Sequence, residues 1–175
     1  MAKSASTTRT SPWEYSIVLR LRGGSRLEFF VSEQVAETLR HTLDEGGPRG
    51  FVVFDSEEAR HAVNCNHLFL HHIRRYPGYR VKMDRRPDLT LKVLFSDSDQ
   101  FQKFDVESDI ADAGDENNPR AAQLQHLMEN AGNGDPRLFF VDDGGDEVNF
   151  GLKEVALISI PLLHVTPNMK SPDDF

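Results

Sequence analysis

The sequence contains an internal repeat, which limits the possible folds more than any other feature. Residues 17–73 have the pattern strand, strand, helix, strand, strand, and residues 89–160 have the same pattern. Each copy begins with two segments of alternating apolar and polar residues around a short turn, which is typical of a β-hairpin. The turn is at Gly23 and Gly24 in the first copy and at Ser96–Asp99 in the second. The repeat therefore predicts two ββαββ units.

A helix is predicted in the middle of each unit. Ser32 is a suitable N-cap for the first helix, and Asn118 followed by Pro119 predicts the start of the second. Apolar residues then recur at helical spacing along one face of each helix. These residues are Val35, Leu39 and Leu43 in the first copy, and Ala121, Leu124, Met128 and Ala131 in the second.

The predicted fold class is α+β, with a tandem pair of ββαββ units, mainly antiparallel sheet and two covering helices. The sheets either pack together or form one continuous sheet. We expect the chain to divide into a disordered tail (1–14), the first repeat (15–76), a basic linker (77–88), the second repeat (89–165) with an acidic loop (109–118), and a flexible C-terminal tail (166–175).

Residues 61–73, HAVNCNHLFLHHI, contain four histidines and the only cysteine of the chain. On a single strand, Cys65, His67 and His71 would share one face, and these residue types are zinc ligands. The second copy keeps the apolar spacing of this segment but has none of these side chains. We therefore interpret the segment as a strand and expect no metal and no cofactor, with Cys65, His67 and His71 as low-ranked metal candidates. Imidazoles at this position also suggest a pH-sensitive interface.

The segment 74–92 carries seven positive charges against two carboxylates, with two tyrosines among them. Cations neutralise phosphates and tyrosine rings stack on unpaired bases, so the segment is a candidate contact for single-stranded RNA or DNA. The alternative is a connector whose arginines pair with the acidic stretch 97–116. The nucleic-acid candidates are Arg74, Arg75, Tyr76, Tyr79, Arg80, Lys82, Arg85 and Arg86.

Composition and missing motifs exclude several classes of protein. The net charge of −8 disfavours non-specific binding to nucleic acid or anionic lipid. One cysteine cannot form an intramolecular disulfide, and no apolar stretch reaches membrane-spanning length, so we expect a soluble cytoplasmic protein without membrane contact. The sequence has no GxGxxG, P-loop, HExxH or GxSxG motif, and its acidic loops miss the spacing of an EF-hand.

These observations predict a protein that is not an enzyme. The leading hypothesis is a non-catalytic protein-interaction or assembly module, because small β-rich units leave open strand edges that must be covered or paired. We expect a protein partner or self-association, through an open edge or a helix-covered sheet face. The second hypothesis is an accessory nucleic-acid-binding protein that uses residues 74–92, and the third is a metal-binding regulator.

Overall fold

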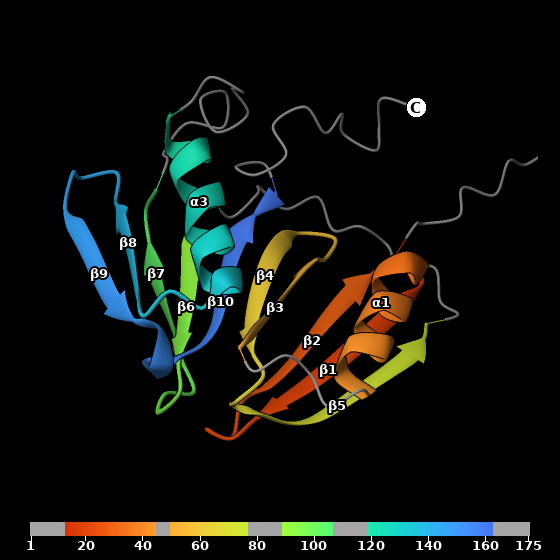
Figure 1. Cartoon of the computed structure of the whole chain (residues 1–175). Helices are drawn as coiled ribbons and strands as arrows, with labels where there is room; N and C mark the ends of the chain where they lie inside the picture. Colours follow the sequence, from red (N-terminus) through yellow and green to blue (C-terminus); the bar gives the residue numbers. More distant parts are fainter. Residues whose placement is uncertain (1–12, 45–49, 77–88, 107–118, 163–175) are drawn as a thin grey trace, which may run out of the picture.

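A computed structural model describes residues 13–44, 50–76, 89–106 and 119–162 of the chain (Figure 1). The elements of the first half are β1 (Tyr15–Leu21), β2 (Arg26–Val31), α1 (Glu33–Asp44), β3 (Phe51–Asp55), β4 (Ala59–Asn64) and β5 (Leu68–Arg75). Those of the second half are β6 (Leu91–Phe95), β7 (Phe101–Phe104), α3 (Pro119–Asn133), β8 (Arg137–Val141), β9 (Glu147–Gly151), a 3₁₀ turn (Leu152–Glu154) and β10 (Val155–Pro161).

The predicted α+β class is confirmed, because the strands pair antiparallel and the described residues form two α-helices. The first helix begins as the sequence predicted. The Val35 N–H donates to the hydroxyl of Ser32 at 3.3 Å, and the Ala36 N–H donates to the Ser32 carbonyl at 3.0 Å. No described helix has both the length and the apolar character that crossing a membrane requires.

The prediction of a single strand across residues 61–73 is wrong. The chain turns at Cys65–His67, where the His67 N–H donates to the Asn64 carbonyl at 3.0 Å and the Leu68 N–H donates to the Cys65 carbonyl at 3.2 Å. β4 therefore ends at Asn64, and β5 leaves to pair with β1 in another sheet. The second half is divided at the corresponding place by the 3₁₀ turn between β9 and β10. Each half has three strands after its helix, not two.

The strands form three sheets, with the orders β2-β1-β5, β3-β4-β10-β6-β7 and β8-β9. The five-stranded sheet joins the two halves of the chain, because β4 of the first half pairs with β10 of the second. Figure 1 shows the hairpin β3–β4 between the two halves, with α1 over β1, β2 and β5 and α3 over β6 and β10.

The two halves share details of strand pairing. The order β2-β1-β5 in the first half corresponds to β7-β6-β10 in the second. Both last strands carry a register shift at the same position. Phe69 forms a bulge between Leu68 and Leu70, which pair with β1. Ala156 forms a bulge between Val155 and Leu157, which pair with β6.

The five-stranded sheet lies between two hydrophobic cores, because alternate residues of its strands point to opposite faces. On one face, Ala62, Val93 and Ile158 belong to a core that includes α3 and the β8–β9 hairpin. On the other face, Val63, Leu94 and Leu157 belong to a core that includes β1 and α1. Both faces of this sheet are thus buried, and β3 is one of its two edge strands.

Candidate functional site

β3 is an edge strand of the five-stranded sheet, and its outer edge has no strand partner among the described residues. The Cys65 N–H donates to the Gly50 carbonyl, and the Ser56 N–H donates to the Ala59 carbonyl, each at 2.8 Å. Backbone groups alternate between the two sides of an antiparallel strand. The N–H and C=O groups of Val52 and Phe54 therefore bond to β4, and those of Val53 point to the open edge.

A groove of about 740 Å³ runs along this edge between the two helices. Its lining residues come from both halves of the chain, which the joint between β4 and β10 brings together. The wall from α1 consists of Gln34, Val35, Thr38 and Leu39. The floor consists of Val52–Asp55 and Arg60. The wall from α3 consists of Gln125, Met128, Glu129, Gly132 and Asn133.

The centre of the groove is apolar and partly open to solvent. The side chain of Val53 is 40% exposed, which is unusual for a large apolar side chain in a sheet between two cores. Gly132 of α3 lies opposite it, and a Cβ added at Gly132 would be 3.8 Å from Val53 Cγ2. The glycine therefore leaves space in the wall of the groove next to the open edge.

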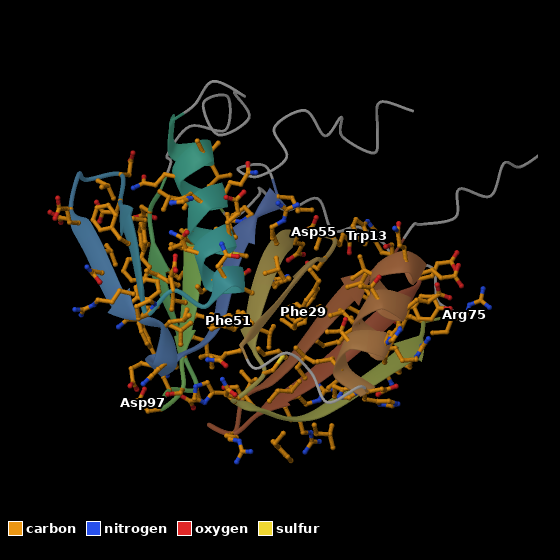
Figure 2. The ribbon with its side chains drawn as sticks, in the orientation of Figure 1. Trp13, Phe29, Phe51, Asp55, Arg75 and Asp97 are labelled. Atoms are coloured by element: carbon orange, nitrogen blue, oxygen red, sulfur yellow. The ribbon has the colours of Figure 1, made fainter. Side chains whose placement is uncertain are left out.

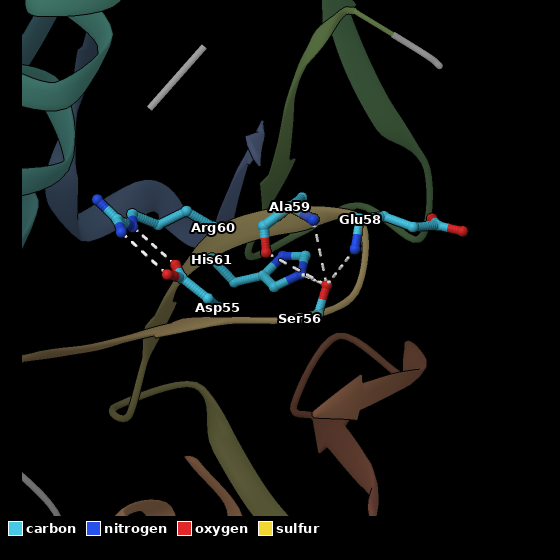
Figure 3. Close-up of polar contacts among 6 residues, drawn as sticks. All are labelled: Asp55, Ser56, Glu58, Ala59, Arg60 and His61. Carbon is cyan, nitrogen blue, oxygen red and sulfur yellow. Dashed lines mark hydrogen bonds and ion pairs between the residues drawn. The ribbon is translucent and has the colours of Figure 1, made fainter. Parts of the chain in front are cut away.

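One end of the groove is closed by an ion pair. Arg60 Nε and Nη2 donate to the two carboxylate oxygens of Asp55 at 2.7 and 2.9 Å (Figure 3). The hydrogen bond to Asp55 raises the pKa of Arg60 above its ordinary value. Such a paired, two-point contact fixes both side chains across the β3–β4 hairpin.

Beside this ion pair, Ser56 of the turn between β3 and β4 contacts His61 of β4 (Figure 3). Ser56 Oγ lies 2.8 Å from His61 Nε2 and accepts hydrogen bonds from the N–H groups of Glu58 and Ala59, each at 3.3 Å. The Ser56 hydroxyl donates to the Ala59 carbonyl at 3.2 Å. This hydroxyl therefore stabilises the turn, as serine side chains commonly do.

The Ser56–His61 contact lacks the features of a nucleophile with its base. Ser56 and His61 are both buried, and His61 Nδ1 has no hydrogen-bond partner among the residues that the structure describes, whereas a catalytic base is normally oriented by a third group at this atom. Burial lowers the pKa of His61 from its ordinary value near 6.5 to about 3. A base with this pKa is a poor proton acceptor at neutral pH.

The three low-ranked metal candidates do not share a face. Cys65 and His67 lie in the turn between β4 and β5, where His67 Nε2 is 3.0 Å from the Lys153 carbonyl oxygen. His71 lies on β5, with Nε2 3.2 Å from Asp44 Oδ1. Burial raises the pKa of the Cys65 thiol, which disfavours the thiolate that binds zinc. Within the described ranges, no three His, Cys, Asp or Glu side chains gather as a metal ion would require.

Of the nucleic-acid candidates, Arg74, Arg75 and Tyr76 are described, and Tyr79, Arg80, Lys82, Arg85 and Arg86 lie outside the described residues, as does the acidic loop 109–118. Arg74 forms an ion pair with Glu28 at 3.1 Å, and Arg75 forms one with Glu14 at 3.6 Å. The ring of Tyr76 packs edge-on against Phe30 at 5.4 Å. Figure 2 shows Arg75 pointing outward at the end of β5.

These contacts pair Arg74 and Arg75 with nearby acids, and they do not favour a nucleic-acid surface here. The Glu28 carboxylate accepts hydrogen bonds from the Ser16 hydroxyl and from Arg74. The hydrogen bond from Ser16 is the main reason that the pKa of Glu28 lies below its usual range.

Comparison with known proteins finds no relative. No family model matches the sequence, and no curated protein and no solved structure matches the chain.

Sequence reasoning missed the groove. Val53 and Gly132 are far apart in the chain and belong to different halves, and only the pairing of β4 with β10 places them together. The segment FVVFD shows an apolar strand, but a local pattern does not show which strand is an edge.

Proposed function

We propose that this protein is a non-catalytic protein-interaction module, built from a tandem α+β repeat, which binds an extended segment of a partner protein in the groove between α1 and α3. The segment would add a strand to the open edge of β3. The observation that carries this proposal is that Val53 directs its backbone N–H and C=O into a groove with two helical walls. Addition of a strand to an exposed edge is a common mode of peptide recognition.

The walls favour a segment with apolar side chains at alternate positions. Successive side chains of an added strand would point in turn toward α1 and toward α3. On the α1 side they would meet Val35 and Leu39, and on the α3 side they would meet Met128 and the space beside Gly132. Backbone hydrogen bonds would supply affinity, and these apolar contacts would supply selectivity.

The proposed tandem repeat explains why the groove lies between the halves. A helix and a hairpin of each half pack against the three-stranded part of the same half, and the β4–β10 pairing then places α3 beside β3. Neither half alone contains both walls. The groove is therefore a product of the assembly of two units.

Peptides selected from a displayed random library on the intact protein should bind in this groove. Gly132→Leu should weaken their binding about tenfold or more, equivalent to about 1.4 kcal/mol or more, because the new side chain fills the space beside Val53. The substitution should not unfold the protein, since leucine favours helix over glycine. Binding is measured by fluorescence anisotropy with labelled peptides, and folding by urea unfolding.

The matched control is Ala122→Leu, which adds the same side chain to an exposed position of α3 that does not line the groove. Val53→Pro is the second test, because it removes the N–H at the open edge while the bonds of Val52 and Phe54 to β4 remain. Peptides that bind equally well to the wild type, to Gly132→Leu and to Val53→Pro would refute the groove as their site.

A further inference from the structure

The outer edges of β5 and β9 are among the strand edges that have no strand partner within the described residues. β5 is the outer strand of the β2-β1-β5 sheet, and β9 belongs to the two-stranded sheet β8-β9. Their counterparts in the other half are β10 and β4, which pair with each other inside the chain. The first half thus has an open edge on β5, which corresponds to β10, and the second half has an open edge on β9, which corresponds to β4.

The correspondence between β4 and β9 extends to individual hydrogen bonds. The hairpin β3–β4 is closed by the bonds Ser56 N–H to Ala59 carbonyl and Cys65 N–H to Gly50 carbonyl. The hairpin β8–β9 is closed in the same way, by Asp142 N–H to Asp146 carbonyl at 3.0 Å and Leu152 N–H to Pro136 carbonyl at 3.1 Å.

These bonds fix which residues of β9 face outward. Alternation along the strand directs the backbone groups of Asn149 to the open edge, as it directs those of Ala62 to β10. The shared register shift aligns Phe69 and Leu70 of β5 with Ala156 and Leu157 of β10.

We infer that this protein associates with a second copy of itself, head to tail, by pairing β9 of one copy with β5 of the next. The register of the β4–β10 joint, in which Val63 pairs with Leu157 and Ala62 with Ile158, carries over to this contact. It places Phe150 opposite Leu70 and Asn149 opposite His71.

Exposed apolar side chains lie where such a contact would cover them. Phe69 and Leu70 are 60% and 43% exposed, whereas Ala156 and Leu157 at the corresponding positions of the joint are 2% and 0% exposed. Phe69 and Leu70 therefore lie on the edge that β9 would cover, and exposed apolar surface of this kind commonly marks an interaction site.

The charges of the two ends are complementary. In the joint, Ala59 pairs with Pro161. Asp146, just before β9, corresponds to Ala59, and Arg74 corresponds to Pro161. The same register therefore places Asp146 opposite Arg74. Glu147 adds a second exposed carboxylate at this end. At the other end, Arg74 and Arg75 pair with Glu28 and Glu14 within the chain, and their side chains are still 49% and 73% exposed. Opposite charges across a strand pair favour the pairing and help to set its register.

A head-to-tail contact joins two different surfaces, so each added copy leaves one free edge of each kind. Light scattering after size exclusion should therefore give a molar mass for the wild type that exceeds one copy and rises with protein concentration. Asn149→Pro removes the outward N–H of β9, and His71→Pro removes that of its proposed partner on β5. Each variant alone should be monomeric.

The decisive sample is an equimolar mixture of the two variants. Each variant retains the end that the other has lost, so the mixture should form a dimer containing one copy of each and should not grow further. A wild type that is monomeric at all concentrations, or a mixture that stays monomeric, would overturn the proposal. Urea unfolding checks that each variant is folded, and Leu70→Lys replaces His71→Pro if the proline is not tolerated.

The groove variant Gly132→Leu separates this proposal from the function proposed above. It should form the same assemblies as the wild type, since Gly132 lies on neither β5 nor β9. Loss of peptide binding together with normal assembly would show that the groove and the strand ends act independently, and loss of assembly in Gly132→Leu would contradict this contact.

Discussion

Phe140→Ala should lower the free energy of unfolding by about 3–5 kcal/mol, whereas Phe139→Ala should change it by less than about 0.5 kcal/mol. The two phenylalanines are neighbours on β8 but point to opposite faces. Phe140 is 0% exposed and packs edge-on against Phe104 at 5.2 Å, whereas Phe139 is 46% exposed. Truncation of Phe140 leaves a cavity in the core under α3, and truncation of Phe139 removes side-chain atoms that are half in solvent.

Urea unfolding of both variants in dilute protein provides the measurement. A loss of about 4 kcal/mol is a large part of the stability of a typical domain, so Phe140→Ala is expected to be partly unfolded well below the midpoint temperature of the wild type. Equal effects of the two substitutions would contradict the assignment of Phe140 to the core.

The wild type should lose about 2 kcal/mol of stability between about pH 7.5 and pH 5, and His61→Leu should lose much less over the same range. In the unfolded chain a histidine binds a proton near pH 6.5, whereas burial lowers the pKa of folded His61 to about 3. Between these values the unfolded state binds more protons than the folded state. The stability that depends on His61 therefore falls as the pH decreases through this window, and this loss ends below about pH 3.

The surroundings of His61 explain why the folded state resists protonation. The ring packs against Phe29 and Phe54, with centroid distances of 4.3 and 5.3 Å, and within the described part of the chain no group can accept a hydrogen bond from a proton added at Nδ1. The nearby carboxylate of Asp55 opposes the effect and Lys92 adds to it, but burial is the largest cause. Above pH 5 most carboxylates remain ionised in both states, so the loss in this range reports on histidine.

The control for this prediction is His72→Leu, which removes an exposed histidine of β5. This variant should keep the pH dependence of the wild type. Urea unfolding at several pH values gives the result, and an unchanged slope in His61→Leu would show that other groups cause the acid sensitivity.

The sequence predicted those parts of the fold that depend on local chemistry. Ser32 lies at the start of a helix, Gly23 and Gly24 lie in a hairpin turn, and the polar residues Asp142–Asp146 connect two paired strands. Each of these follows from side chains or backbone freedom within a few residues. The α+β class follows from their order along the chain.

The sequence did not predict features that depend on contacts between distant segments. The break at Cys65–His67 follows from the transfer of the chain from one sheet to another, and the apolar pattern of residues 61–73 is compatible with one strand or two. The burial of His61 depends on Phe29, which lies on a different strand. The candidate groove depends on the pairing of β4 with β10, whose paired residues are about a hundred positions apart in the sequence.

Amide hydrogen exchange measured by NMR tests the proposed groove most directly. In the free protein, the Val53 amide should exchange faster than those of Val52 and Phe54, because only the latter donate to β4. A peptide selected from the library should slow exchange at Val53 and leave Val52 and Phe54 unchanged. This result would show that the peptide pairs with the open edge of β3. Slowed exchange confined to other strands, with Val53 unaffected by a bound peptide, would contradict the account.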